Sequence, residues 1–126
     1  MRIGIDAMGS DFSPKNEIEG ILLANDYFSK NHCDDIELVL YGDSVEIEKV
    51  AHKHNFGISK FKRIHSSQKI EMNDDPTEIL KTKRDSSLYL GIQDLKDGKI
   101  DAFLSAGNTG AMLTCSTVLL GRIKGV

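Results

Sequence analysis

One short apolar run constrains the fold of this 126-residue chain more than any other feature. Residues 36–41 read Ile-Glu-Leu-Val-Leu-Tyr, which is too short for a helix and apolar at successive positions. Successive side chains of a strand point to opposite faces of a sheet, so such a run is typical of a parallel strand that is buried on both faces. We therefore expect a sheet that is covered by helices.

Strand and helix signals alternate along the rest of the chain. Strands are expected at residues 2–6, 36–41, 61–65 and 100–104. Helices are expected at residues 14–29, 45–54, 87–96 and 111–120. A further helix is expected to start at the Asp-Pro-Thr-Glu of 75–78, where Asp75 and Glu78 have the spacing of a capping box. We expect Ser13 to cap the first helix and Gly57 to end the second. This order predicts an α/β fold with a mainly parallel sheet, in one domain or part of one.

Composition argues against several classes of protein. Acidic residues outnumber basic ones by 19 to 16, and the net charge of -3 disfavours a protein that binds nucleic acid through its phosphates. No apolar run approaches the roughly 18 residues that a membrane-spanning helix needs. The two cysteines, Cys33 and Cys115, are too far apart for a zinc pair and too few for a disulfide framework. A reduced intracellular chain is therefore expected.

The Gly-rich turn at residues 105–110 is a candidate phosphate site, because it joins the last expected strand to the last helix. Ligands of open parallel sheets bind beyond the carboxyl ends of the strands, and the N–H groups at a helix N-terminus favour an anion. The residues that would permit close approach or donate hydrogen bonds are Gly107, Gly110, Ser105, Asn108 and Thr109. On spacing alone, phosphate binding and a plain tight turn are equal alternatives.

A run of cations and hydroxyls at residues 81–87 is a second candidate. Lys83 or Arg84 could pair with a phosphate or an acidic substrate group. The spacing alone favours a solvated helix end, followed by a helix that Asp85 or Ser86 caps.

Two aspartates, Asp6 and Asp11, flank the loop that follows the first expected strand. They could bind magnesium or act as a base. We favour a structural interpretation, in which their carboxylates accept hydrogen bonds from the backbone of the turn. Cys115 lies in the last apolar helix and is expected in the core rather than as a nucleophile.

Three blocks of sequence, taken together, resemble the phosphate acyltransferases of bacterial phospholipid synthesis. The blocks are Ile-Asp-Ala-Met-Gly-Ser-Asp at 5–11 with Pro-Lys at 14–15; Ile-Glu-Met at 70–72 with Asp-Pro at 75–76 and Lys-Arg-Asp-Ser-Ser at 83–87; and Ser-Ala-Gly-Asn-Thr-Gly-Ala at 105–111 with Gly-Arg-Ile-Lys-Gly at 121–125. They occur in this order and at fitting intervals. Ser10 departs from the pattern, because the family usually has a second glycine there.

The resemblance implies an activity and a setting. Family members move a long-chain fatty acyl group from acyl carrier protein to inorganic phosphate, and the acyl-phosphate feeds a glycerol-phosphate acyltransferase at the membrane. The implied fold is like that of phosphotransacetylase and isocitrate dehydrogenase. A homodimer in the cytoplasm, with peripheral membrane contact and without metal or organic cofactor, is expected. Family chains are much longer, so residues 1–126 are expected to be the N-terminal α/β portion of such an enzyme, either as a fragment or as a truncated gene product.

The resemblance also implies roles for individual residues. Lys83 and Asn108 are the expected catalytic positions, with Lys83 assisting electrostatically. Phosphate would be bound by Ser105, Gly107, Asn108, Thr109 and Gly110, with Asp85 and Ser86 orienting Lys83 and with Lys15 as a weaker candidate. A basic patch for the acidic acyl carrier protein could draw on Lys81, Lys83 and Arg84, or on Arg122 and Lys124, with a solvated face as an equal alternative.

Two alternatives remain open on the sequence. The first is a phosphate acyltransferase that uses coenzyme A in place of acyl carrier protein. The second is a phosphate- or nucleotide-binding module without catalysis. A nicotinamide-dependent dehydrogenase is disfavoured, because neither the dinucleotide glycine motif nor its ribose-binding acid follows the first strand.

Overall fold

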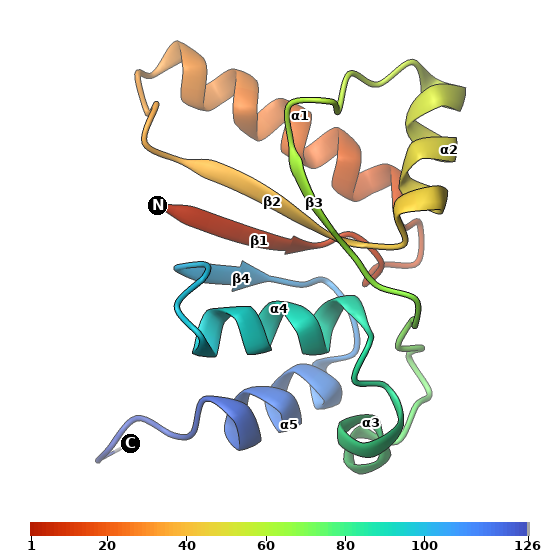
Figure 1. Cartoon of the computed structure of the whole chain (residues 1–126), viewed down its shortest axis with the longest axis vertical. Helices are drawn as coiled ribbons and strands as arrows, with labels where there is room; N and C mark the ends of the chain where they lie inside the picture. The colour runs from red at the N-terminus through yellow and green to blue at the C-terminus, as the bar shows by residue number, and fades with distance from the viewer. Residues whose placement is uncertain (126) are drawn as a thin grey trace.

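The computed structural model describes residues 1–125 as a parallel sheet with helices on both sides (Figure 1). The elements in chain order are β1 (Arg2–Asp6), α1 (Lys15–Lys30), β2 (Glu37–Gly42), α2 (Ser44–His54), β3 (Lys62–His65), α3 (Pro76–Thr82), α4 (Ser87–Lys96), β4 (Ala102–Leu104) and α5 (Thr109–Leu119). The strand order is β3-β2-β1-β4, and every neighbouring pair is parallel. The predicted α/β fold is confirmed.

The apolar run that predicted a buried strand forms β2, an interior strand of the sheet. Its side chains alternate between two cores. Leu38 and Leu40 face α1 and α2 and pack in a cluster with Ile18 of α1. Tyr41 faces the other side, where α4 packs on β1, β2 and β4. Both faces of β2 are covered, which is why the run is apolar at successive positions.

The helices α3, α4 and α5 form a third apolar cluster outside the sheet. Ile79 of α3, Leu88 and Ile92 of α4, and Ala111 and Cys115 of α5 are all buried in it. Cys115 is therefore a core residue, as predicted, and burial raises the pKa of its thiol. In Figure 1, α5 lies outside α4, on the side away from the sheet.

The N-terminus of α1 differs from the prediction. The helix begins at Lys15 rather than Pro14, and no side chain caps it. The hydroxyl of Ser13, which was expected to cap the helix, donates instead to the carbonyl oxygen of Ser10 at 2.8 Å. Ser13 therefore closes the turn between residues 10 and 13 and is not available to the helix.

The last residue of α2 is His54, as predicted, but the residue that ends the helix is not Gly57. The helix stops at Asn55, which adopts the left-handed conformation with φ of 56°. Its backbone N–H bonds to the carbonyl oxygens of Ala51 and His52. Asparagine tolerates this conformation better than most residues, so Asn55 ends the helix before Gly57 is reached.

The start of α3 is confirmed in part. The carboxylate of Asp75 accepts a hydrogen bond from the N–H of Thr77 at 2.8 Å, as a helix cap should. The reciprocal half of the expected capping box does not form, because the Glu78 side chain pairs with Lys81 at 3.2 Å.

The parallel arrangement brings the turns after all four strands to one edge of the sheet (Figure 1). These turns contain residues 7–14, residue 43, residues 66–75 and residues 105–108. Within residues 1–125, no helix is long and apolar enough to cross a membrane. In the same part of the chain, no three His, Cys, Asp or Glu side chains gather where a metal ion could bind.

Candidate functional site

A buried carboxylate, Asp6, lies where β1 reaches the carboxyl edge of the sheet. Its side chain accepts three hydrogen bonds. Oδ1 accepts from the N–H of Met8 at 3.0 Å and from the hydroxyl of Ser87 at 2.6 Å, and Oδ2 accepts from the hydroxyl of Ser105 at 2.7 Å. The bond to Met8 confirms the structural interpretation of Asp6. The other two join β1 to the start of α4 and to the end of β4.

Two glycines bring the loops after β1 and β4 into backbone contact. A Cβ atom on Gly9 would lie 2.8 Å from Oδ2 of Asp6 and 3.0 Å from the nitrogen of Gly107. A Cβ atom on Gly107 would lie 3.1 Å from the Cα of Gly9. The close approach that Gly107 permits is therefore made by another loop of the protein. The two loops form one surface at the site.

Asn108 is the N-cap of α5 and is almost fully buried. Its Oδ1 accepts from the N–H of Ala111 at 3.0 Å, while its Nδ2 donates to the carbonyl oxygens of Glu71 and Met72 at 3.1 and 3.2 Å. The amide thus fixes the turn 105–110 against the loop that precedes α3. Gly110 has a related packing role, because a Cβ atom there would lie 2.7 Å from Cγ of Pro76.

The start of α5 keeps some polar groups toward solvent. The first N–H groups of a helix have no partner within the helix, and the side chain of Asn108 takes only that of Ala111. Thr109 is the first residue of α5 and is exposed. Ser105 is committed elsewhere, since its hydroxyl donates to Asp6 and accepts from the N–H of Gly107 at 3.1 Å. An anion at this turn would therefore meet the backbone and Thr109 before it met Ser105 or Asn108.

Lys83 lies at the C-terminal end of α3 and is about three-quarters buried. Its ammonium group bonds to the carboxylate of Asp74 and, at 2.8 Å, to the carbonyl oxygen of Lys69. The hydrogen bond from Lys83 holds the pKa of Asp74 below its usual value. The residue that orients the ammonium is therefore Asp74, which the sequence did not single out.

Asp85 and Ser86 have other partners. The carboxylate of Asp85 accepts from the N–H and the hydroxyl of Ser67, and the hydroxyl's bond lowers the pKa of Asp85. Ser86 caps α4, as the structural interpretation predicted, and donates to the carbonyl oxygen of Lys83 at 2.7 Å. Ser86 therefore fixes the backbone of Lys83, whereas Asp85 fastens the loop after β3.

Lys15, the weaker candidate, is in the first turn of α1. Its ammonium lies 3.6 Å from Glu19, one turn along the helix, and its side chain is about half exposed. Within residues 1–125, the Lys15 side chain makes no hydrogen bond or ion pair with the turn 105–110, so its phosphate-binding role stays a prediction.

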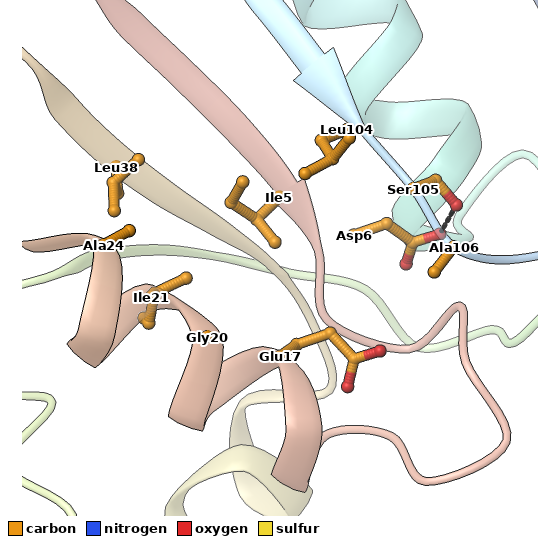
Figure 2. Close-up of a pocket in the computed structure, with 10 residues that line it drawn as sticks. All are labelled: Ile5, Asp6, Glu17, Gly20, Ile21, Ala24, Leu38, Leu104, Ser105 and Ala106. Atoms are coloured by element: carbon orange, nitrogen blue, oxygen red, sulfur yellow. Dashed lines mark hydrogen bonds between the residues drawn. The ribbon is translucent and has the colours of Figure 1, made fainter.

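An apolar groove of about 320 Å³ lies beside this site, between α1 and the ends of β1 and β4 (Figure 2). Asp6, Glu17 and Ser105 stand at one end of it. Its remaining lining is mainly apolar: Ile5, Gly20, Ile21, Ala24, Leu38, Leu104 and Ala106. The sequence did not predict this groove, because its walls come from four elements, β1, α1, β2 and β4, that are separated along the chain.

Comparison with known proteins identifies the family. The model of the fatty acid synthesis protein family matches residues 1–126. This chain belongs to that family. It is 44% identical to a phosphate acyltransferase of Caldicellulosiruptor bescii over 126 residues, 36% identical to one of Latilactobacillus sakei, and 42% identical over 125 residues to one of Streptococcus equi. The resemblance found in the sequence is confirmed.

The match covers this chain almost completely but only part of each relative. The alignments cover 99–100% of this chain but only 35–36% of the length of these relatives. The chain thus spans about a third of a family phosphate acyltransferase, and the enzyme class of its relatives is an acyltransferase.

Proposed function

We propose that this family member, together with the region that its longer relatives possess, transfers a long-chain fatty acyl group from acyl carrier protein to inorganic phosphate. The product is acyl-phosphate for phospholipid synthesis. One observation carries the proposal: the turn 105–110 opens α5 at the carboxyl edge of the sheet, in a chain whose relatives at 36–44% identity are phosphate acyltransferases.

In this proposal, the start of α5 holds the phosphate. Backbone N–H groups of Thr109 and Gly110 point toward the anion, and the hydroxyl of Thr109 donates a further bond. The positive end of the helix dipole favours a charged ligand at this place. Asn108, Ser105 and Gly107 act mainly by shaping the turn, as their contacts with Ala111, Asp6 and Gly9 suggest.

Lys83 supplies positive charge to the site. An ammonium group has three N–H donors, and two of them are used by Asp74 and by the carbonyl oxygen of Lys69. The third is left for a phosphate oxygen. Because two protein groups already fix the ammonium, little conformational entropy is lost when phosphate binds.

The acyl transfer then follows from position and charge. A phosphate oxygen attacks the carbonyl carbon of the thioester, so that a C–O bond forms and the C–S bond breaks. The thiolate leaves with the electron pair on the acyl carrier protein. Negative charge develops on the carbonyl oxygen, and fixed N–H groups and a cation stabilise it. No metal or organic cofactor takes part in this scheme.

The partners belong to the same proposal. Acyl carrier protein is acidic. Lys81 and Arg84 are exposed cations beside Lys83 at the end of α3, whereas Arg122 and Lys124 are exposed after the C-terminal end of α5, the end away from the turn 105–110 (Figure 1). The homodimer, the cytoplasmic location, peripheral contact with the membrane and a downstream glycerol-phosphate acyltransferase complete it. A coenzyme A donor and a non-catalytic phosphate-binding protein are the alternatives.

A turnover assay separates these possibilities. The chain is joined to the remaining part of the C. bescii phosphate acyltransferase and supplied with inorganic phosphate and either long-chain acyl carrier protein or the matching acyl coenzyme A. We expect acyl-phosphate mainly with acyl carrier protein. Preference for coenzyme A would support the first alternative. Phosphate binding without any acyl-phosphate would support the second.

Variants of the joined protein test the site. Thr109→Val should raise the KM for phosphate several-fold, and Lys83→Ala should lower kcat/KM at least tenfold. Lys30→Ala, an exposed lysine at the far end of α1, is the matched control and should change neither. Thermal unfolding is followed in parallel, because Lys83 also braces the loop before α3. Unchanged kinetics in Thr109→Val and Lys83→Ala would contradict the assignment.

A further inference from the structure

The apolar groove beside the candidate site has one polar end and one apolar end (Figure 2). Asp6, Glu17 and Ser105 lie at the polar end, and Ala24 and Leu38 lie at the opposite end. Its volume of about 320 Å³ is in the range of pockets that bury small molecules, which also combine an apolar lining with few polar groups. The groove therefore fits a ligand that is apolar along its length and polar at one end.

The polar end of the groove is continuous with the turn that opens α5. Ser105 and Ala106 belong to this turn, and both line the groove. Asp6, which accepts a hydrogen bond from Ser105 at 2.7 Å, lies between the groove and the turn. A ligand in the groove would thus have its polar end beside the turn 105–110 and its apolar part directed along α1.

The α1 wall of the groove is formed in part by small residues. Gly20 and Ala24 are about one helical turn apart, and both line the groove. A Cβ atom on Gly20 would meet nothing within 4 Å. No packing contact thus requires glycine here, although glycine weakens a helix. The missing side chain leaves room inside the groove.

One acceptor at the polar end lacks a partner. Oε1 of Glu17 accepts from the hydroxyl of Ser13 at 3.3 Å. Within residues 1–125, Oε2 of Glu17 is buried and makes no hydrogen bond. Buried polar atoms normally have a partner, and a carboxylate oxygen needs one that donates. The amide N–H of a pantetheine arm, which lies close to the thioester sulfur in both acyl carrier protein and coenzyme A donors, is such a group.

We propose that the groove binds the fatty acyl chain of the acyl donor. The thioester lies at the end formed by Asp6, Glu17 and Ser105, and the methylene groups run toward Ala24 and Leu38. This inference rests on the proposed function, which makes an acyl thioester the ligand. Glu17 accepts the N–H of the pantetheine arm, and the carbonyl carbon faces the turn 105–110.

The charge at the polar end also sets a preference between ligands. A free fatty acid would bring its own carboxylate against those of Asp6 and Glu17, which costs electrostatic energy. An acyl thioester is uncharged at the same place. The groove therefore favours the thioester over the free acid with the same chain.

The test measures binding to the joined protein in the absence of phosphate. The probes are the hexanoyl, octanoyl, decanoyl and dodecanoyl thioesters of N-acetylcysteamine, which contain the thioester and the N–H of the pantetheine arm. Isothermal titration calorimetry gives each Kd. Because each added methylene group leaves water, affinity should rise about two- to fourfold per methylene group.

Gly20→Leu fills the groove from the α1 side. It should weaken binding of the dodecanoyl thioester about tenfold, as if roughly two methylene groups were displaced. Leucine favours the helix more than glycine does, so Tm should not fall, and the KM for phosphate should stay unchanged. Gly57→Leu is the matched control, because a Cβ atom on Gly57 also meets nothing within 4 Å but Gly57 lies outside the groove. It should leave binding of every probe unchanged.

Glu17→Gln tests the polar end. It removes a negative charge and keeps an oxygen acceptor, so it should strengthen binding of dodecanoate several-fold and leave binding of the dodecanoyl thioester nearly unchanged. Glu19→Gln is its control, because Glu19 is also on α1 but does not line the groove. It should not alter the binding of dodecanoate.

Two results would overturn the proposal. Affinity that is independent of chain length would mean that another part of the longer protein fills the groove. A Gly20→Leu variant that binds the dodecanoyl thioester as tightly as the wild type would place the chain elsewhere. Chain-length-dependent binding that Gly20→Leu abolishes, in a protein that forms no acyl-phosphate, would contradict only the proposed function, so the two failures are distinguishable.

Discussion

At the scale of single residues, Asp6 joins more segments of the chain at the candidate site than any of the expected phosphate ligands does. It is 3% exposed and accepts hydrogen bonds from three segments of the chain. Of its partners, Ser87 is the first residue of α4, and Ser105 directly follows β4. The hydrogen bonds of such a buried carboxylate stabilise the fold as a group, because removing the carboxylate leaves each donor without a partner.

Replacing Asp6 should therefore destabilise the whole chain. We expect Asp6→Ala to lower the free energy of unfolding by about 3 kcal/mol, since three donors lose a charged acceptor in a buried place. Urea denaturation followed by circular dichroism measures the change. Asp11→Ala is the control, because Asp11 is exposed, and its effect should stay within about 0.5 kcal/mol. Equal effects of the two substitutions would contradict the structural role of Asp6.

The ion pair between Asp74 and Lys83 makes a pH-dependent contribution. The bond from Lys83 lowers the pKa of Asp74 in the folded chain, so the ionised form stabilises the fold. This stabilisation is complete above the ordinary value of 3.8 and disappears as the pH falls through the lowered pKa. Asp74→Asn should lower the free energy of unfolding by about 1 kcal/mol at pH 7.

The difference between the wild-type chain and Asp74→Asn should vanish in strong acid. Urea denaturation at a series of pH values tests this expectation. Asp26→Asn removes the exposed pair between Asp26 and Lys30 on α1 and should cost less than Asp74→Asn at pH 7. A difference between wild type and Asp74→Asn that stayed constant down to pH 2 would mean that the carboxylate does not supply the stabilisation.

At the scale of elements, a glycine allows α4 to pack closely on the sheet. A Cβ atom on Gly91 would lie 1.9 Å from Cε2 of Phe103, which is in β4. Phe103 in turn packs edge-on against Tyr41 of β2, with ring centroids 5.6 Å apart. The absence of a side chain at Gly91 therefore sets how closely the helix approaches the strands.

Alanine at two helical glycines should have opposite effects. Gly91→Ala should lower the free energy of unfolding by about 2 kcal/mol, because α4 has to move away from Phe103. Gly20→Ala in α1 should raise it by about 0.5 kcal/mol, since a Cβ atom at Gly20 meets nothing within 4 Å and alanine is the better helix former. Thermal or urea unfolding of both variants checks the pair. A neutral Gly91→Ala would show that the packing at Phe103 adjusts at no cost.

The existence of each element was predictable, whereas some of its ends were not. Helix caps depend on one side chain and the few residues beside it, which is why Asp75 and Ser86 were identified in advance. The exceptions arose where another local bond was stronger. Ser13 was drawn into the turn with Ser10, and Asn55 ended α2 before Gly57.

At the scale of the whole molecule, the strand order decides which groups meet. Parallel strands place all four following turns at one edge, so loops more than 90 residues apart along the chain share a site. The same order leaves β3 and β4 as the two edges. Of these two edge strands, β3 carries mainly charged side chains, whereas β4 carries apolar ones and ends beside the candidate site.

The sequence by itself determined the alternation of strands and helices, the Gly-rich turn that opens α5, and membership of the family. These features rest on short patterns of apolar, capping and turn residues, which act over a few positions. The tertiary structure alone decided that Asp74, rather than Asp85, holds Lys83, and that Asp6 joins Ser87 to Ser105. It also decided which strand edge is left open. Such contacts depend on the packing of distant segments, which no local pattern encodes.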